Sequence, residues 1–366
     1  MPNWSILALL AVGACVALMK PGVFDGTFAH AVLYVFLPPL LFEAAWNLDG
    51  RIMLTHWRPI FALAVPGVVV TAAMVSSALL LTGFPALPAL LTGVIVSATD
   101  PITIVAIFQR LPIPSALSTI VQSEALLNDG MAVVLYRVVL LVGAGTLSGE
   151  TFFIRGLGAL SAVAGGLILG SLWAFLIAPM LRRNGTSVQA ALTLGGAYLA
   201  YYSAEVAHGS GIFAVVAFGV TVREIECRAG ERATAPAVQK FWSGAALVAN
   251  GSVFFLTGAA LHLPTTASHW YAALSAVAAV VLARLILAYL LVPVALGRMP
   301  NPAWSHVLRA AGARGALCLA LAIALPAATV FRGQIIEVTV SVVVATLLLS
   351  ALEVPRTLRA FVAPSV

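Results

Sequence analysis

The sequence contains Ser97-Ala98-Thr99-Asp100-Pro101 and, one predicted helix later, Glu124-Ala125-Leu126-Leu127-Asn128-Asp129. Both stretches lie inside runs that are otherwise apolar, in a chain that is 61% hydrophobic and only 9% charged. A carboxylate at the centre of a bilayer costs about 2.5–3.5 kcal/mol even on a lenient insertion scale. These acids are therefore expected to have partners, water or an ion, and they are the first place to look for function.

The composition places the chain among membrane proteins. Its mean hydropathy is +1.06, which leaves too few charges to solvate the surface of a soluble domain. The net charge of +6 comes from basic residues spread singly between apolar runs, a pattern that indicates membrane orientation and not a nucleic-acid partner. The spacing of Cys15, Cys227 and Cys318 indicates neither a disulfide framework nor a zinc site, and no cofactor is expected.

Polar residues and Pro/Gly breaks divide the chain into about twelve segments long enough to span a bilayer. The predicted segments are 3–19, 27–46, 58–82, 86–108, 114–142, 152–180, 187–206, 209–223, 238–262, 269–296, 303–329 and 334–353. The loops between them leave no room for a soluble regulatory domain. The predicted fold class is therefore an all-α polytopic membrane protein.

The basic residues predict the orientation of these segments. If the N-terminus is cytoplasmic, the cytoplasmic loops hold Arg51, Arg58, Arg110, Arg182, Arg183, Arg223, Arg228, Arg232, Lys240, Arg298, Arg356 and Arg359. The opposite side holds only Lys20, Arg155 and Arg332. This asymmetry follows the positive-inside rule and predicts a multi-pass protein of the cell (inner) membrane with both termini in the cytoplasm.

Two further arginines bear on the interior. Arg309 can reach the cytoplasmic interface by extending its side chain along the helix. Arg284 lies about fifteen residues into an apolar run and cannot easily reach either surface. It is therefore expected to have an internal carboxylate partner.

Pro101 predicts an interruption of the fourth segment. Proline lacks a backbone donor and disfavours helical dihedrals at the residue before it, so the helix should break at Thr99 and Asp100. The freed Ser97 carbonyl, the Thr99 hydroxyl and the Asp100 carboxylate would then offer the oxygen ligands that hard cations prefer. An ordinary proline kink capped by Asp100 is the alternative.

The acids of the fifth segment divide into two groups by helical geometry. Glu124 and Asn128 are four residues apart and share a face, whereas Asp129 is turned about 100° from Asn128. A buried carboxylate can hold a cation in one state and a proton in another, and we assign this role to Asp129. For Glu124 a structural polar network is favoured, and Glu43, late in an apolar helix, is predicted either as an ion ligand or as an interfacial acid.

Four motifs in order along the chain resemble those of NhaP/NHE-type sodium/proton antiporters, of the monovalent cation:proton antiporter superfamily. They are Leu37-Pro38-Pro39-Leu40-Leu41-Phe42-Glu43, the two stretches quoted first, and Ala313-Arg314-Gly315-Ala316 followed by Leu325-Pro326. The resemblance implies the NhaA-like fold, with inverted repeats and two discontinuous helices that cross at mid-membrane. It also implies one transmembrane domain over 1–366, with core helices at about 86–142 and 269–329 and the rest forming a dimerisation or scaffold part. The fourth and eleventh segments are seven apart and so run in opposite directions, as an inverted pair requires.

The resemblance also implies roles for individual residues. By motif position, Asp129 would be the principal cation and proton carboxylate, and Asp100 and Thr99 would complete the Na⁺ site. Asn128 would be the amide that marks the electroneutral branch, and Glu43 matches an acid that can join the ion shell.

The same motifs imply a core ion pair and reveal two departures from the family pattern. Glu124 would pair with a core arginine, either Arg284 or Arg314. The family commonly has serine where this chain has Ala125, so one hydroxyl ligand is missing and water can replace it. Family members usually carry another helix before the segment that resembles 3–19, and because that helix contributes to their dimer interface, a homodimer is an open expectation here.

The sequence-based hypothesis is a secondary antiporter, not an enzyme, that exchanges Na⁺ (or Li⁺ or K⁺) for H⁺ by alternating access, electroneutrally. Its partners would be the monovalent cation, the proton and the lipid bilayer, with no nucleic acid. The alternatives are a sodium-coupled symporter of an organic solute on the same fold, a K⁺/H⁺ antiporter, and a membrane scaffold without transport. The six histidines are scattered, and no catalytic or metal-ligand spacing is present.

Overall fold

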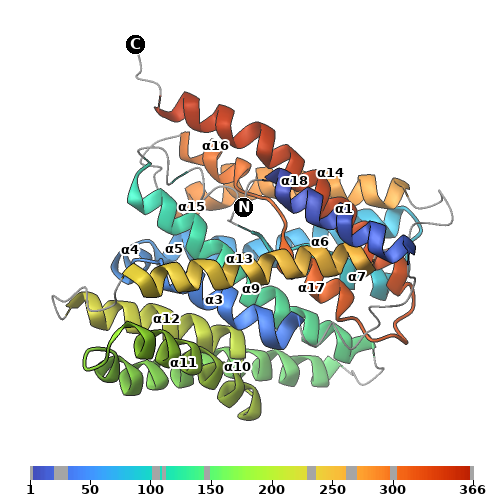
Figure 1. The fold of residues 1–366 in the computed structure, drawn as a ribbon. Helices are drawn as coiled ribbons and strands as arrows, with labels where there is room; N and C mark the ends of the chain where they lie inside the picture. The colour runs from blue at the N-terminus through green and yellow to red at the C-terminus, as the bar shows by residue number, and fades with distance from the viewer. Residues whose placement is uncertain are drawn as a thin grey trace. The chain divides into compact units, whose positions relative to one another are not determined.

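The computed structural model describes residues 3–19, 32–100, 108, 113–143, 149–228, 236–260, 270–296 and 303–362, and these residues form helices and connecting turns without a strand (Figure 1). The helices are α1 (Asn3–Met19), η1 (Val32–Phe36), α3 (Leu37–Trp46), α4 (Gly50–Thr55), α5 (Trp57–Ala64), α6 (Pro66–Leu81), α7 (Ala86–Ile95), α9 (Ser115–Gly143), α10 (Gly149–Leu181), α11 (Thr186–Val206), α12 (Gly211–Arg228), α13 (Pro236–Ala260), α14 (Trp270–Ile286), η3 (Leu287–Leu291), α15 (Val292–Leu296), α16 (Ala303–Ala310), α17 (Ala316–Ile323) and α18 (Arg332–Val362).

The chain forms two compact units. Unit 1 comprises Met1–His30, Thr55–Leu140 and Gly251–Val366, and unit 2 comprises Ala31–Leu54 and Leu141–Asn250. Each unit is thus assembled from segments that are distant in the sequence. Whether the units act as a mobile core and a scaffold stays a prediction.

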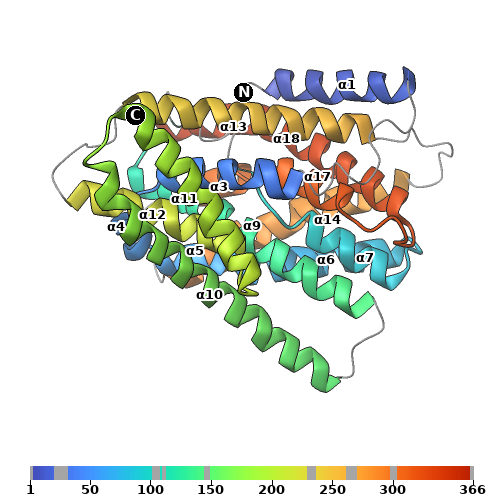
Figure 2. The same ribbon diagram turned by 60° about the horizontal axis from the view of Figure 1, so that its bottom comes forward.

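In unit 1, α6 and α7 form a tight helical hairpin (Figures 1 and 2). The turn between them contains Gly83 at a φ of 85°, a left-handed conformation that glycine adopts without strain. The Ser76 hydroxyl donates to the Ala72 carbonyl at 2.6 Å and lies 3.2 Å from the Ala89 carbonyl on α7. A Cβ at Gly93 would overlap α6 at Ala72 and Ser76, so this glycine permits the close approach of the two helices.

In unit 2, α10 packs along α12 through glycines. A Cβ at Gly166 would overlap the Ser210 carbonyl, and one at Gly170 would overlap the Ala214 carbonyl. The small residues therefore bring two backbones of the same unit together. Also in unit 2, the rings of Phe42 on α3 and Trp242 lie 4.3 Å apart, tilted by 39°, and the Trp242 indole nitrogen donates to the Thr193 hydroxyl at 3.0 Å.

Among the described residues, four helical stretches are long and apolar enough to cross a membrane by length and composition: Trp57–Leu81, Gly156–Leu181, Trp270–Ala295 and Arg332–Leu358. The chain is a multi-pass membrane protein. The described helices also follow the other predicted segments, but the count of twelve crossings stays a prediction.

Two local predictions of the sequence analysis were wrong. A short helix, α4, occupies what was expected to be a loop, and the Asp49 carboxylate caps it by accepting from the backbone of Arg51 and Ile52 at 2.9 and 3.1 Å. The last helix was expected to end at 353 but continues through Pro355 to Val362. The stop was placed before this proline, which is instead accommodated inside α18.

Candidate functional site

Two interruptions of the helices in unit 1 define the site. α7 ends at Ile95 and the chain is non-helical from there to Asp100; α16 ends at Ala310, and residues 311–315 are non-helical before α17 begins. The first break is where the sequence predicted it, although Pro101 itself lies outside the described residues. The second coincides with the paired glycines of Gly312-Ala313-Arg314-Gly315.

The two breaks are bonded to each other. The Asp100 backbone N–H donates to the Ala313 carbonyl at 2.8 Å. A Cβ at Gly315 would overlap the Asp100 carboxylate, although the φ of Gly315 is −144° and needs no glycine. Glycine is thus required at this position for the space that the Asp100 side chain fills, and not for its backbone angles.

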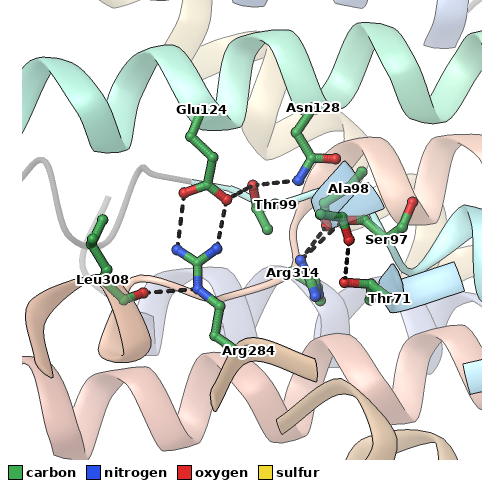
Figure 3. A network of polar contacts seen from close by, with 10 residues as sticks. Thr71, Ser97, Ala98, Thr99, Glu124, Asn128, Arg284, Leu308 and Arg314 are labelled. Carbon is green, nitrogen blue, oxygen red and sulfur yellow. Dashed lines mark hydrogen bonds and ion pairs between the residues drawn. The ribbon is translucent and has the colours of Figure 1, made fainter. Parts of the chain in front are cut away.

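Arg314 holds the end of the first break. Its side chain is 1% exposed, and its Nη1 donates to the Ser97 carbonyl at 3.1 Å and to the Ala98 carbonyl at 3.2 Å (Figure 3). The prediction that the Ser97 carbonyl is available to a cation was therefore wrong for this conformation. The reason is electrostatic, because the backbone carbonyls just beyond the end of α7 carry partial negative charge that a buried guanidinium can match.

Glu124 of α9 and Arg284 of α14 form a buried ion pair (Figure 3). Nη1 lies 2.6 Å from Oε1 and Nη2 lies 2.9 Å from Oε2, while Nε donates to the Leu308 carbonyl at 2.8 Å. The two side chains are only 2% and 5% exposed. Of the two arginines considered as partners, Arg284 is the one hydrogen-bonded to Glu124, and its fork geometry matches both carboxylate oxygens.

The Thr99 hydroxyl links the first break to α9. It lies 3.1 Å from Nδ2 of Asn128 and 3.5 Å from Oε1 of Glu124, between the two side chains that descend from α9 in Figure 3. All three residues are buried. The shared face of α9 therefore carries a structural acid and an amide, as the four-residue spacing required.

Asp129 differs from Glu124 in having no permanent partner of this kind. Its Oδ1 atom is buried and has no hydrogen-bond partner among the residues that the structure describes, and the same is true of Asn128 Oδ1. Asp100, Arg314 and Glu124 are close enough to act on Asp129 electrostatically. This arrangement provides a carboxylate and an amide oxygen that can accept a cation, and the carboxylate can accept a proton instead.

Glu43 is the one predicted site residue that belongs to the other unit. It lies on α3 in unit 2, and its Oε1 accepts from the Asn47 amide at 3.0 Å, one turn along the same helix. The remaining predicted residues are all in unit 1, at the two breaks, on α9 or on α14.

Two further residues lie where the two helix breaks meet, which we call the crossing, and neither was predicted from the sequence. The buried Cys318 thiol lies 3.4 Å from the Ala98 carbonyl, and Thr346 of α18 accepts from the Arg314 backbone N–H at 3.1 Å. The cysteine spacing predicted neither a disulfide nor a zinc site for Cys318, and no other role was assigned to it. The one feature of the sequence that could have indicated the role of Cys318 is its position one helical turn after Arg314. No comparable feature was available for Thr346.

Comparison with known proteins gives a consistent result over nearly the whole chain. Residues 5–360 match the family model described as "Sodium/hydrogen exchanger, transmembrane". The chain is 32% identical over 361 residues to the low-affinity Na⁺/H⁺ antiporter NhaS1 of Synechocystis sp., covering 94% of this chain and 67% of that protein. It is 34% identical to the Na⁺/H⁺ antiporter ApNhaP of Aphanothece halophytica, covering 88% of this chain and 63% of that protein. The chain thus spans about two thirds of the length of these relatives.

The fold is also similar to a solved structure. The sodium proton antiporter MjNhaP1 of Methanocaldococcus jannaschii at pH 8 superposes with a TM-score of 0.79, covering 94% of this chain and 92% of that one. At 20% sequence identity this likeness shows the fold alone. The NhaA-like fold implied by the resemblance is therefore confirmed.

Proposed function

Because the chain belongs to the sodium/hydrogen exchanger family, we propose that it exchanges Na⁺ for H⁺ across the membrane. One observation carries the proposal: the Asp129 carboxylate has a buried oxygen without a hydrogen-bond partner in the described structure, whereas Glu124 is matched by Arg284. A carboxylate whose charge is already neutralised by arginine gains little free energy from binding a second cation. One without such a partner gains free energy from either Na⁺ or a proton, and the two compete.

The proposed cycle uses this competition. Deprotonated Asp129 takes Na⁺ from one side, with the Asn128 amide oxygen, Thr99 and Asp100 completing the oxygen shell. The protein then changes conformation so that the site opens to the opposite side of the membrane, and a proton from that side displaces the cation. One cation is exchanged for one proton, so the cycle moves no net charge, and Li⁺ or K⁺ can replace Na⁺ to the extent that the oxygen shell accommodates their radii.

The proposal includes an orientation and an assembly. Both termini lie in the cytoplasm of a cell (inner) membrane, which is supported by the twelve-to-three distribution of basic residues between the two sides. A homodimer is implied by the family resemblance alone. Its test is the mass of the purified protein in detergent or nanodiscs.

Proton flux in proteoliposomes tests the exchange. We expect Na⁺-dependent dissipation of a pH gradient by the wild type, unchanged when the membrane potential is clamped, and no such flux from Asp129→Asn. Asp49→Asn is the matched control, because Asp49 is an exposed acid whose capping oxygen an asparagine retains. Undiminished flux in a folded Asp129→Asn protein would overturn the proposal, and Na⁺-driven uptake of an organic solute without proton counterflow would favour a symporter. Replacing Na⁺ by Li⁺ or K⁺ in the same assay ranks the cations.

A further inference from the structure

Tyr136 is a buried polar residue that the exchange site does not use. It lies on α9 seven residues after Asp129, which is two helical turns along the axis and within about 20° of the same face. The residue is 5% exposed, and its hydroxyl is buried without a hydrogen-bond partner in the described part of the chain.

An unpartnered buried hydroxyl needs a physical explanation. Leaving such a group unsatisfied costs free energy, and a phenylalanine ring would fill the same space without this cost. A phenol both donates and accepts, so it can hold a water molecule that is itself bound to a cation or carries a proton. The hydroxyl is therefore explained if water reaches it in another conformation of the protein.

Arg332 connects Tyr136 to the end of α17. Its charge acts on the Tyr136 hydroxyl, and its guanidinium donates to the Ile323 carbonyl at 2.9 Å and to the Leu325 carbonyl at 3.0 Å. The Ile323 carbonyl lies at the negative end of the α17 dipole and the Leu325 carbonyl lies just beyond it, and both offset the arginine charge locally. Arg332 is also one of the few basic residues on the predicted outward side, so the face that carries Asp129 and Tyr136 leads toward that side.

We propose that the outward half of the ion route follows the Asp129–Tyr136 face of α9, and that the Tyr136 hydroxyl is a positioning residue that orders water between Asp129 and the outward solution. This inference rests on the proposed exchange function. A neutral hydroxyl suits the role, because it can replace part of the hydration shell of a cation without trapping it as a second carboxylate would.

Cysteine accessibility tests the route directly. Tyr136→Cys and Val134→Cys are made with the exposed Cys15 and Cys227 replaced by serine, and that background is tested alone. Val134 is also buried, at 8% exposed, but two residues along a helix place it about 200° around from Tyr136. A membrane-impermeant, positively charged thiol reagent is applied separately to right-side-out and inside-out vesicles. We expect labelling of Tyr136→Cys from the outward side, with loss of exchange, and no labelling of Val134→Cys.

Tyr136→Phe provides a second measurement that does not depend on cavity formation. It should raise the outward-side apparent KM for Na⁺ several-fold while thermal stability is unchanged or slightly higher, which a purely packing role would not produce. The inference is overturned if Tyr136→Cys resists the reagent as Val134→Cys does, or if Tyr136→Phe has wild-type kinetics. Labelling does not require ion flux, so the two proposals can fail separately. If Tyr136→Cys is not labelled but Asp129→Asn is inactive, the exchange proposal stands and the route is rejected. If Tyr136→Cys is labelled but Asp129→Asn is fully active, only the exchange site is refuted.

Discussion

In the Glu124–Arg284 pair, each buried charge should stabilise the other, so that removing either one alone destabilises the folded protein. We consider Glu124→Ala, Arg284→Ala and the double variant. Glu124→Ala leaves a guanidinium whose remaining hydrogen bond in the described structure is to the Leu308 carbonyl at 2.8 Å, and Arg284→Ala leaves a carboxylate with the Thr99 hydroxyl at 3.5 Å. Each single change therefore strands a charge that is at least 95% buried.

The magnitude follows from this burial. Removing one partner of a buried pair costs about 3–5 kcal/mol, most of it the desolvation of the charge left behind. The double variant has no stranded charge, so its loss should resemble that of one single variant instead of the sum. The coupling energy then equals the loss of the other single variant, about 3–5 kcal/mol. The pair of Arg309 and Glu353, at 2.7 Å but 26% and 37% exposed, is the control and should couple by less than about 1 kcal/mol.

The coupling can be measured from the free energy of unfolding of the four proteins of each cycle, by titrating purified protein in mixed micelles with dodecyl sulfate. The same proteins are assayed for exchange, with flux normalised to folded protein. If the Glu124–Arg284 coupling is no larger than that of the exposed pair, the assignment of Glu124 to a structural ion pair is wrong. Its five-residue distance from Asp129 would then have to be explained by a role in transport.

Three further predictions concern the two helix breaks and the predicted cytoplasmic end. Gly315→Ala should abolish exchange, because its Cβ would displace the Asp100 carboxylate that packs on this glycine. Gly333→Ala, whose Cβ meets no atom within 4 Å, is the control and should retain wild-type flux. Equal activity of the two variants would show that the space beside Asp100 is not needed. Thr99→Val keeps the side-chain shape but removes the hydroxyl that lies 3.1 Å from the Asn128 amide. Its apparent KM for Na⁺ should therefore rise at least several-fold, and Thr99→Ser should restore the wild-type value. A wild-type KM in the valine variant would exclude the hydroxyl from the site. Hydrogen bonding to Arg228 lowers the pKa of Glu224, just beyond the predicted span 209–223, so its stabilising contribution is present above about pH 4.5 and is lost as pH falls further. Glu224→Gln should therefore flatten the acid limb of a thermal-stability profile between about pH 5 and 3, and an unchanged limb would contradict this.

The sequence predicted those parts of the site that depend on local chemistry. Pro101 acts on its own backbone, so the first break could be placed without knowledge of the fold. The need of Arg284 for a carboxylate followed from the cost of a charge in an apolar run. The choice between Arg284 and Arg314 as partner of Glu124 could not be made in this way, because it depends on how helices distant in the sequence cross.

The errors have the same origin. The Ser97 carbonyl was expected to face an ion because the break frees it locally, but Arg314 approaches it from 217 positions away in the chain. Cys318 and Thr346 are small and nearly neutral, so their sequence context gives no indication that they are hydrogen-bonded at the crossing. Long-range placement, and not residue chemistry, limited the prediction.

The directions of the hydrogen bonds explain how a structural ion pair can support the proposed exchange site beside it. An ionised Glu124 can only accept, and two of its bonds come from Arg284. The single proton of Thr99 is therefore directed toward Glu124, which leaves the Thr99 oxygen to accept from the amide nitrogen of Asn128. That orientation turns the amide oxygen of Asn128 away from Thr99, where it remains unpartnered in the described structure, as does Oδ1 of Asp129. The ion pair thus orients the amide oxygen of Asn128, one of the proposed cation ligands, without being part of the proposed cation site.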